Sequence, residues 1–140
     1  MSDQSIGALS RQSGVKIPTI RYYESIGLIP DPPRSPGGQR RYGAAHLERL
    51  RFIRHGRELG FSLDDLRALQ QLADRPDQSC EEADAIARRQ LAEVDRRLAG
   101  LTALKGDLEA MVETCAHGVV GECRVIATLS DHALCRHDHD

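Results

Sequence analysis

The chain has 140 residues and a formal net charge of −2, with 40% hydrophobic and 29% charged residues. These values predict one compact domain with a small appendage, and they are unlike those of a disordered chain or a membrane protein. No apolar run approaches the roughly 20 residues of a membrane-spanning helix, and the first residues lack the basic-then-apolar order of a signal peptide. We therefore expect a cytoplasmic protein, in which 4 cysteines favour metal or redox chemistry over structural disulfides.

The charges are unevenly distributed along the chain. Residues 1–67 carry 11 Lys and Arg against 7 Asp and Glu, whereas residues 68–140 carry 8 against 14. Arg makes up 17 of the 19 basic residues, and its forked guanidinium suits phosphate and guanine. High-GC codon usage also enriches Arg, so composition alone leaves both explanations open. The basic first part is nevertheless typical of a nucleic-acid-binding surface.

Two short helices are predicted at the start of the chain. The first has Ser5 as its N-cap and Gly14 as its stop signal. The second covers 17–26 and tolerates Pro18 because this residue falls in its first turn. A tight turn containing glycine joins them, so the pair is a candidate helix-turn-helix.

The next segment is too rich in proline and glycine for a helix. Residues 29–43 read IPDPPRSPGGQRRYG, and Gly37-Gly38 indicates the tip of a small hairpin or wing. Helical periodicity resumes over 47–59 and ends at Gly60. Ser62 with Asp65 predicts the cap of another helix that runs to about Leu72.

A single long helix is predicted from a capping box at Ser79 to about Thr114. Apolar residues recur at alternating four- and three-residue steps: Ala87, Leu91, Val94, Leu98, Leu101, Leu108 and Val112. The neighbouring chain is too short to cover such a stripe, so we expect a homodimer through a coiled coil. A helix that folds back on the first domain is the alternative.

Polar and basic residues lie where a helix-turn-helix protein contacts DNA. On the second helix these are Thr19, Arg21 and Tyr22, which can reach base edges and flanking phosphates. On the wing, Gln39, Arg40 and Arg41 would add phosphate contacts. The following helix offers Arg49, Arg54 and Arg57, of which one or two would reach the DNA backbone. Each of these arginines would otherwise belong to a solvated face.

The cysteines predict a metal site that needs two chains. Cys80 and Cys115 lie at opposite ends of the long helix, roughly 50 Å apart, whereas a metal–sulfur bond is about 2.3 Å. An antiparallel partner helix would place its own Cys80 beside Cys115. Cys115 and Cys123 enclose a glycine-containing loop, so three thiolates can converge on a soft ion such as Zn(II), Cd(II), Pb(II) or Hg(II). His117 could complete a tetrahedral set, and Cys80 alone would otherwise be a small buried apolar residue.

The order of these segments resembles the MerR family of bacterial transcription regulators. The resemblance lies in IGALSRQSGVKIPTIRYYESIGLI, then GGQRRY, then HLERLRFIRHGRELGFSLDDLRAL. It implies a mostly α fold: a winged helix-turn-helix at 4–74, an antiparallel coiled-coil dimerisation helix at 79–114, and a metal-binding loop, short helix and tail at 115–140. It also implies that the dimer activates RNA polymerase at a promoter by underwinding double-stranded DNA. Arg21, Tyr22, Arg40 and Tyr42 would contact this DNA.

The cysteine layout is similar to that of the zinc, cadmium and lead sensors of this family. Cys80, Cys115 and Cys123 match their motif, and RVIATL after Cys123 resembles their short final helix. Copper and gold sensors carry Ser at the position of Cys80, yet the seven-residue loop here is similar to theirs. A Cu(I)-type sensor therefore stays an alternative, as does a thiol redox sensor.

The end of the chain adds a second group of ligand-type side chains. Cys135, His137 and His139 resemble the His-rich tails of some cadmium sensors, so they form a possible auxiliary metal site. A frayed terminus is the plainer interpretation. An enzyme is disfavoured because the predicted ion would be enclosed by protein sulfur, with no evident base or open substrate cleft.

Overall fold

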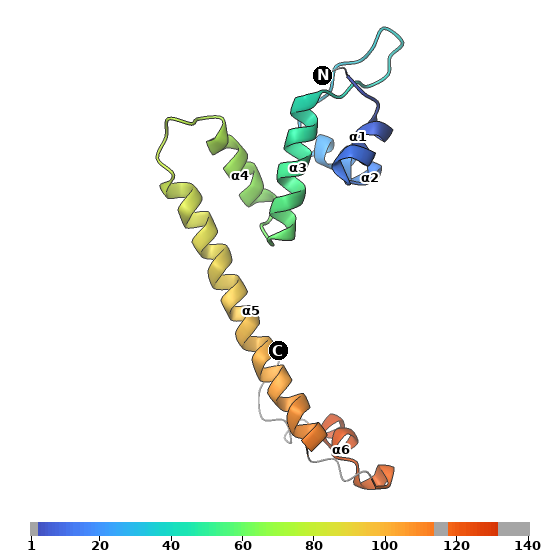
Figure 1. The fold of residues 1–140 in the computed structure, drawn as a ribbon, viewed down its shortest axis with the longest axis vertical. Coiled ribbons are helices and arrows are strands. Elements are labelled where there is room, and N and C mark those ends of the chain that lie inside the picture. Colours follow the sequence, from blue (N-terminus) through green and yellow to red (C-terminus); the bar gives the residue numbers. More distant parts are fainter. Residues whose placement is uncertain (1–2, 114–117, 132–140) are drawn as a thin grey trace. The chain divides into compact units, whose positions relative to one another are not determined.

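The fold consists of helices joined by turns and, between α2 and α3, by a longer wing, as the sequence predicts. A computed structural model describes residues 3–113 and 118–131, within two compact units, Met1–Ile86 and Ala87–Asp140. All regular elements of this described part are helical (Figure 1): α1 (Ile6–Ser13), α2 (Ile17–Ser25), α3 (Ala44–Glu58), α4 (Leu63–Ala73), α5 (Glu81–Glu113), the 3-10 helix η1 (Val120–Glu122) and α6 (Arg124–Ser130). None of these helices is long and apolar enough to cross a membrane.

The caps of α1 and α2 explain the tight turn between them. Ser5 Oγ accepts a hydrogen bond from the Ala8 N–H at 3.2 Å, which confirms it as the N-cap of α1. Gly14 ends α1 with φ 74°, a left-handed conformation that favours glycine. Lys16 occupies the N-cap position of α2 without a side-chain hydrogen bond, and Pro18 follows in the first turn. The two helices therefore form the predicted helix-turn-helix.

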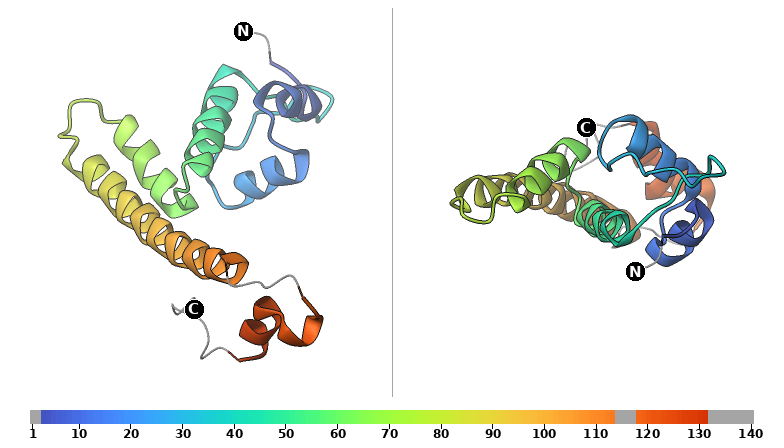
Figure 2. Two further views of the ribbon diagram at one scale, coloured as in Figure 1. Left: turned by 60° about the horizontal axis from the view of Figure 1, so that its bottom comes forward. Right: turned by 90° about the horizontal axis from the view of Figure 1, so that it is seen from above.

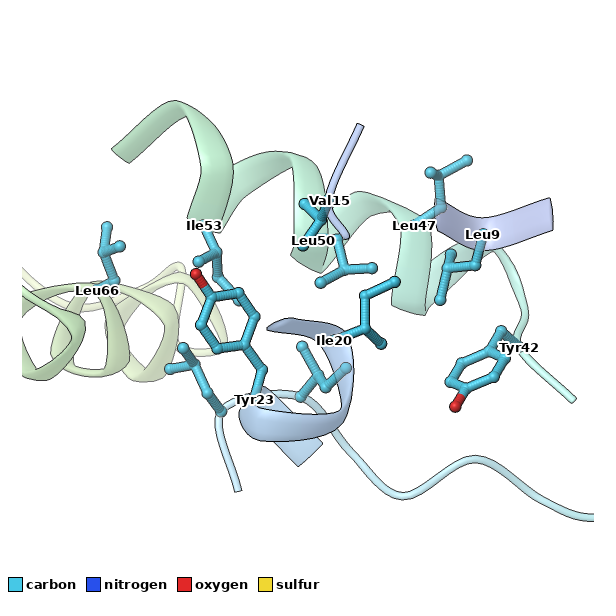
Figure 3. Close-up of a cluster of buried hydrophobic side chains, with 11 residues drawn as sticks. Leu9, Val15, Ile20, Tyr23, Tyr42, Leu47, Leu50, Ile53 and Leu66 are labelled. Carbon is cyan, nitrogen blue, oxygen red and sulfur yellow. The ribbon is translucent and has the colours of Figure 1, made fainter. Parts of the chain in front are cut away.

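The core of the first unit lies where α1, α2 and α3 meet (Figure 3). Leu9 of α1, Ile20 of α2 and Leu50 of α3 are fully buried there. α4 also packs on α3 (Figure 2) and contributes Leu66 to the same cluster. Burial of such side chains is worth about 1.5 to 3 kcal/mol each, so this cluster holds α2 firmly in place.

The wing between α2 and α3 is held by very few backbone contacts. Its two sides form one isolated antiparallel bridge, between Arg34 and Arg40. The described residues contain no extended β-strand. Ser35 N–H donates to the Gln39 carbonyl at 2.7 Å, and Gly38 at the tip has φ 83°. The predicted hairpin tip is thereby confirmed.

α5 is one uninterrupted helix of 33 residues (Figures 1 and 2). Its first i-to-i−4 hydrogen bond runs from the Asp84 N–H to the Cys80 carbonyl at 2.9 Å, so Cys80 is its N-cap. Ser79 Oγ accepts instead from the Glu81 N–H at 3.2 Å. The helix thus begins one residue later than the predicted capping box requires. Leu91, Leu98, Leu101, Leu108 and Val112 are exposed along the single chain.

The short helix predicted after Cys123 is present as α6. Only Cys123 separates it from η1 in the chain. The Cys123 N–H donates to the Val120 carbonyl at 3.0 Å. Thr128 is the buried residue of α6, and its hydroxyl donates to the Arg124 carbonyl at 2.8 Å.

Candidate nucleic-acid interface and metal-ligand residues

α2 presents a polar face beside its buried one. Ile20 and Tyr23 are buried in the core, three residues apart on the helix. Arg21 and Tyr22 are exposed, Tyr22 to 53%, and Thr19 is half-buried. The three predicted contact residues of α2 are thus accessible on a helix whose opposite face is anchored in the core.

A basic hollow of about 450 Å³ lies between α2, the start of α1 and the wing. Three arginines from separate segments line it: Arg21 of α2, and Arg34 and Arg40 of the wing. Arg34 Nη1 also donates to the Gly38 carbonyl at 2.9 Å, across the wing tip. Three guanidinium groups at one hollow favour an anion such as a phosphate. Arg34 is absent from the sequence prediction, although its place opposite Arg40 in a hairpin around Gly37-Gly38 was a usable signal.

A second hollow of about 400 Å³ lies beside Thr19. It is lined by residues of the α1–α2 turn, of α2 and of the C-terminal half of α3: Gly14, Val15, Lys16, Thr19, Tyr23, Arg54, Arg57 and Glu58. Lys16 is exposed here and was not among the predicted contacts. Because Thr19 lines this hollow and Arg21 the first, basic side chains flank the exposed face of α2.

The arginines of α3 make internal contacts that the sequence did not indicate. Arg54 Nη1 donates to the Ser13 carbonyl at the end of α1 at 3.0 Å. Arg57 Nη1 donates to the Phe61 carbonyl at 2.8 Å, and Arg49 lies 3.7 Å from the Asp74 carboxylate. Each of these side chains therefore ties two segments of the first unit together.

On the wing, Tyr42 differs from its neighbours in exposure. Gln39 and Arg40 are exposed and Arg41 is half-buried, so these three are accessible to DNA. The Tyr42 side chain is fully buried, and its hydroxyl donates to Glu24 Oε1. The prediction that Tyr42 contacts DNA is therefore wrong for its side chain, because the backbone bridge from Tyr42 to Gln4 turns that side chain into the core.

The environment of the Tyr42 hydroxyl disfavours the phenolate. Burial, together with the hydrogen bond to the Glu24 carboxylate, raises the pKa of Tyr42 to about 12. Tyr42 stays a neutral hydrogen-bond donor at neutral pH. It thereby connects the wing to the last turn of α2.

The structure describes two of the predicted metal ligands. Cys80 is exposed and Cys123 is half-buried, and both are free thiols. Cys115 and His117 lie outside the described residues, as do the possible auxiliary ligands Cys135, His137 and His139. Among residues 3–113 and 118–131 of one chain, no group of three or more His, Cys, Asp or Glu lies close enough to hold an ion.

Cys80 borders an apolar hollow of about 330 Å³ within the first unit. Its lining includes Phe52 of α3, Leu69 and Leu72 of α4, and Ala83 of α5. The thiol is therefore accessible at the edge of an apolar surface formed by three helices.

Two family models match the chain. Residues 4–73 match the model described as MerR HTH family regulatory protein, and residues 47–111 match the one described as MerR, DNA binding. The second match extends through most of α5.

Individual relatives cover nearly the whole chain. The HTH-type transcriptional regulator HmrR of Rhizobium leguminosarum bv. viciae is 40% identical over 129 residues, which is 92% of this chain and 99% of the relative. The mercuric resistance operon regulatory protein of Serratia marcescens is 36% identical over 131 residues, covering 92% and 89%. The crystal structure of the transcription regulator PbrR691 from Ralstonia metallidurans CH34 in complex with lead(II) is similar with a TM-score of 0.76 and 36% identity, covering 90% and 98%.

Proposed function

This chain belongs to the MerR family of helix-turn-helix regulatory proteins, and from that premise we propose that it activates metal-resistance or efflux genes when it binds a soft divalent metal ion. The family consists of DNA-binding regulators, not enzymes. Zn(II), Cd(II) and Pb(II) are the ions we propose first. Activation would proceed by distortion of promoter DNA to which RNA polymerase is bound.

The exposed face of α2 supports DNA binding through the major groove. Thr19, Arg21 and Tyr22 are the residues we propose to reach base edges. Gln39, Arg40 and Arg41 of the wing, with Arg34 added from the structure, are proposed to bind phosphates and set the register of the protein on DNA.

The exposed apolar stripe of α5 supports a homodimer. Leu98 and Leu101 are 55% and 61% exposed in the single chain, on a helix with no break. A contiguous apolar face of this kind marks a protein–protein contact. We propose that two copies of α5 pack antiparallel as a coiled coil.

The observation that carries the metal proposal is an accessible thiol at the N-cap of an uninterrupted helix. Cys80 is exposed there, and α5 extends from it over 33 residues to Glu113, about 50 Å along the helix axis. Cys115 is the second residue after Glu113 in the sequence. Cys80 of one chain with Cys115 and Cys123 of its partner would supply three soft donors. When bound, a soft ion would bridge these thiolates, and His117 is the proposed fourth ligand.

The relatives support the same class of ligand. One is named as a regulator of mercuric resistance, and another was crystallised with lead(II). The donor set of three thiols fits both of these ions and Zn(II) or Cd(II). A Cu(I) sensor is the second candidate because Cys115 and Cys123 enclose a loop of seven residues. Cys135, His137 and His139 are proposed as an auxiliary site.

The test combines metal stoichiometry with a promoter response. The full-length protein is titrated separately with Zn(II), Cd(II), Pb(II), Hg(II) and Cu(I), and in-vitro transcription is measured from a promoter containing an operator selected by the protein. We expect a divalent ion to activate transcription. The Cys115→Ser and Cys123→Ser variants should lose that activation and keep DNA affinity, because the ligands lie outside the DNA-binding unit. Cys135→Ser removes only the proposed auxiliary ligand, so it should lower the metal stoichiometry and keep the promoter response.

Two results would contradict the proposal. Loss of DNA affinity in the Cys115→Ser or Cys123→Ser variant would make these residues structural. A response to Cu(I) that survives Cys80→Ser, with no response to the divalent ions, would favour the copper alternative, since linear Cu(I) needs only two thiolates.

A further inference from the structure

We infer that Glu24 is the positioning residue of the wing: its carboxylate holds Arg40 in the basic hollow, in place to receive a DNA phosphate. This inference rests on the proposed DNA binding and adds a residue that itself makes no DNA contact.

The Glu24 carboxylate is buried between α2 and the wing. Its side chain is only 6% exposed, in the last turn of α2. Oε2 lies 3.1 Å from Arg40 Nη1, and Oε1 accepts the hydrogen bond from the Tyr42 hydroxyl. A carboxylate removed from water needs such partners to stay charged, and both of them come from the wing.

Arg40 keeps hydrogen-bonding capacity for DNA in this arrangement. A guanidinium has five N–H donors in a planar fork, so one bond to Glu24 leaves others that can reach a phosphate. The Arg40 side chain is 42% exposed and lines the same hollow as Arg21 and Arg34. Glu24 thus fixes one edge of the fork while the remainder faces the anion site.

The tip of the wing benefits from this contact because no extended strand holds it among the described residues. Arg34 and Arg40 form the one bridge between the two sides of the wing, in addition to the bridge from Tyr42 to Gln4 at its end, and Gly38 at the tip has a left-handed φ. A long arginine on such a segment would lose conformational freedom on binding DNA, which weakens binding. The Glu24 contact imposes that order before DNA arrives.

Glu24 could also lower the affinity for DNA, so the direction in which its removal changes that affinity tests the inference. A carboxylate near DNA repels phosphates, so its removal would strengthen binding if repulsion were its only effect. Positioning through Arg40 predicts that removal weakens binding, and only while Arg40 is present.

The experiment is a double-mutant cycle on DNA affinity. The full-length protein and the Glu24→Gln, Arg40→Ala and doubly substituted variants are titrated with a duplex selected by the wild-type protein from a random pool. Glu24→Gln keeps the size of the side chain and an acceptor for the Tyr42 hydroxyl. We expect it to weaken binding about three- to tenfold when Arg40 is present. In the Arg40→Ala background we expect no loss, or a small gain from the removed charge.

Two controls separate positioning from folding and from net charge. Glu48→Gln removes one negative charge from an exposed position on α3 and should leave the affinity within about twofold. Thermal unfolding of each variant, followed by circular dichroism, reports any loss of fold. The dependence of affinity on salt should become shallower for Arg40→Ala, by about one ion, and stay unchanged for Glu24→Gln.

The outcomes distinguish this inference from the proposed function. Equal weakening by Glu24→Gln with and without Arg40, or stronger binding with Arg40 present, would overturn the positioning role. If the wild-type protein selects no duplex at all, the DNA-binding proposal fails first.

Discussion

Arg54 illustrates how one side chain can serve the fold at a surface where DNA binding is expected. From α3 it donates to the carbonyl of Ser13, the last residue of α1, and its Nε lies 3.4 Å from Glu58. The guanidinium thereby covers Gly14, where an added Cβ would meet the flexible end of the Arg54 side chain. Glycine is required at this turn by its positive φ, whereas the Arg54 side chain can shift to make room for a Cβ.

At this scale we predict that Gly14→Ala destabilises the protein by about 1 to 2 kcal/mol, since an L-residue is strained at φ 74°. The free energy of unfolding in urea measures this effect. Gly100→Ala is the matched control: it lies inside α5 with nothing within 4 Å of an added Cβ, so it should stabilise by up to about 1 kcal/mol. Equal stability of the Gly14→Ala variant and the wild type would refute the argument.

Among the elements, α5 exposes a long row of apolar side chains to solvent in the single chain. Its leucines are exposed at heptad spacing, and its opposite face carries charged groups such as Glu93, which bonds Arg96 and Arg97. Those ion pairs are exposed and contribute little. Burial of the apolar stripe against a second copy would contribute about 1.5 to 3 kcal/mol per leucine.

We accordingly predict that Leu98→Lys weakens self-association by about 2 kcal/mol or more, because a charge would replace an apolar contact at the proposed interface. Ala99→Lys, one position along on the outer side of the heptad, should leave the assembly intact. Light scattering after size-exclusion chromatography, at several concentrations, measures both. A wild-type protein that is monomeric throughout would rule out the coiled coil.

For the whole molecule, the chain divides into two compact units, Met1–Ile86 and Ala87–Asp140. The first unit holds the helix-turn-helix and Cys80, and the second holds Cys123. A metal site made from both would link the state of the ion to that of the DNA-binding unit. By linkage, the ion must then bind the activating state more tightly than the repressing one.

A mixed dimer tests whether two chains build each site. One chain carries Cys80→Ser and the other Cys115→Ser, each with its own affinity tag for purification of the mixed species. Ligands from opposite chains leave one intact site in this dimer, so at the site of Cys80, Cys115 and Cys123 it should bind half the metal of the wild-type dimer, whereas each variant homodimer should bind none there. A mixed dimer that binds no metal would show that one chain supplies the complete set.

The predictions from sequence succeeded where a local signal acts. Ser5, Gly14 and Ser62 cap or end helices as predicted, because a cap involves backbone groups only a few residues away. Arg34 was missed although the hairpin around Gly37-Gly38 places it opposite Arg40, whereas the burial of Tyr42 depends on how the wing folds over α2.

By itself, the sequence determined the order and approximate bounds of the helices, the hairpin tip at Gly38 and the heptad face of α5, since each follows from backbone chemistry or periodicity within a few residues. Only the tertiary structure decided which polar side chains face outward. Tyr42 pairs with Glu24, 18 residues away, and Arg54 with Ser13, 41 residues away. Such pairings depend on the packing of α1, α2 and α3 around one core, which no local pattern encodes.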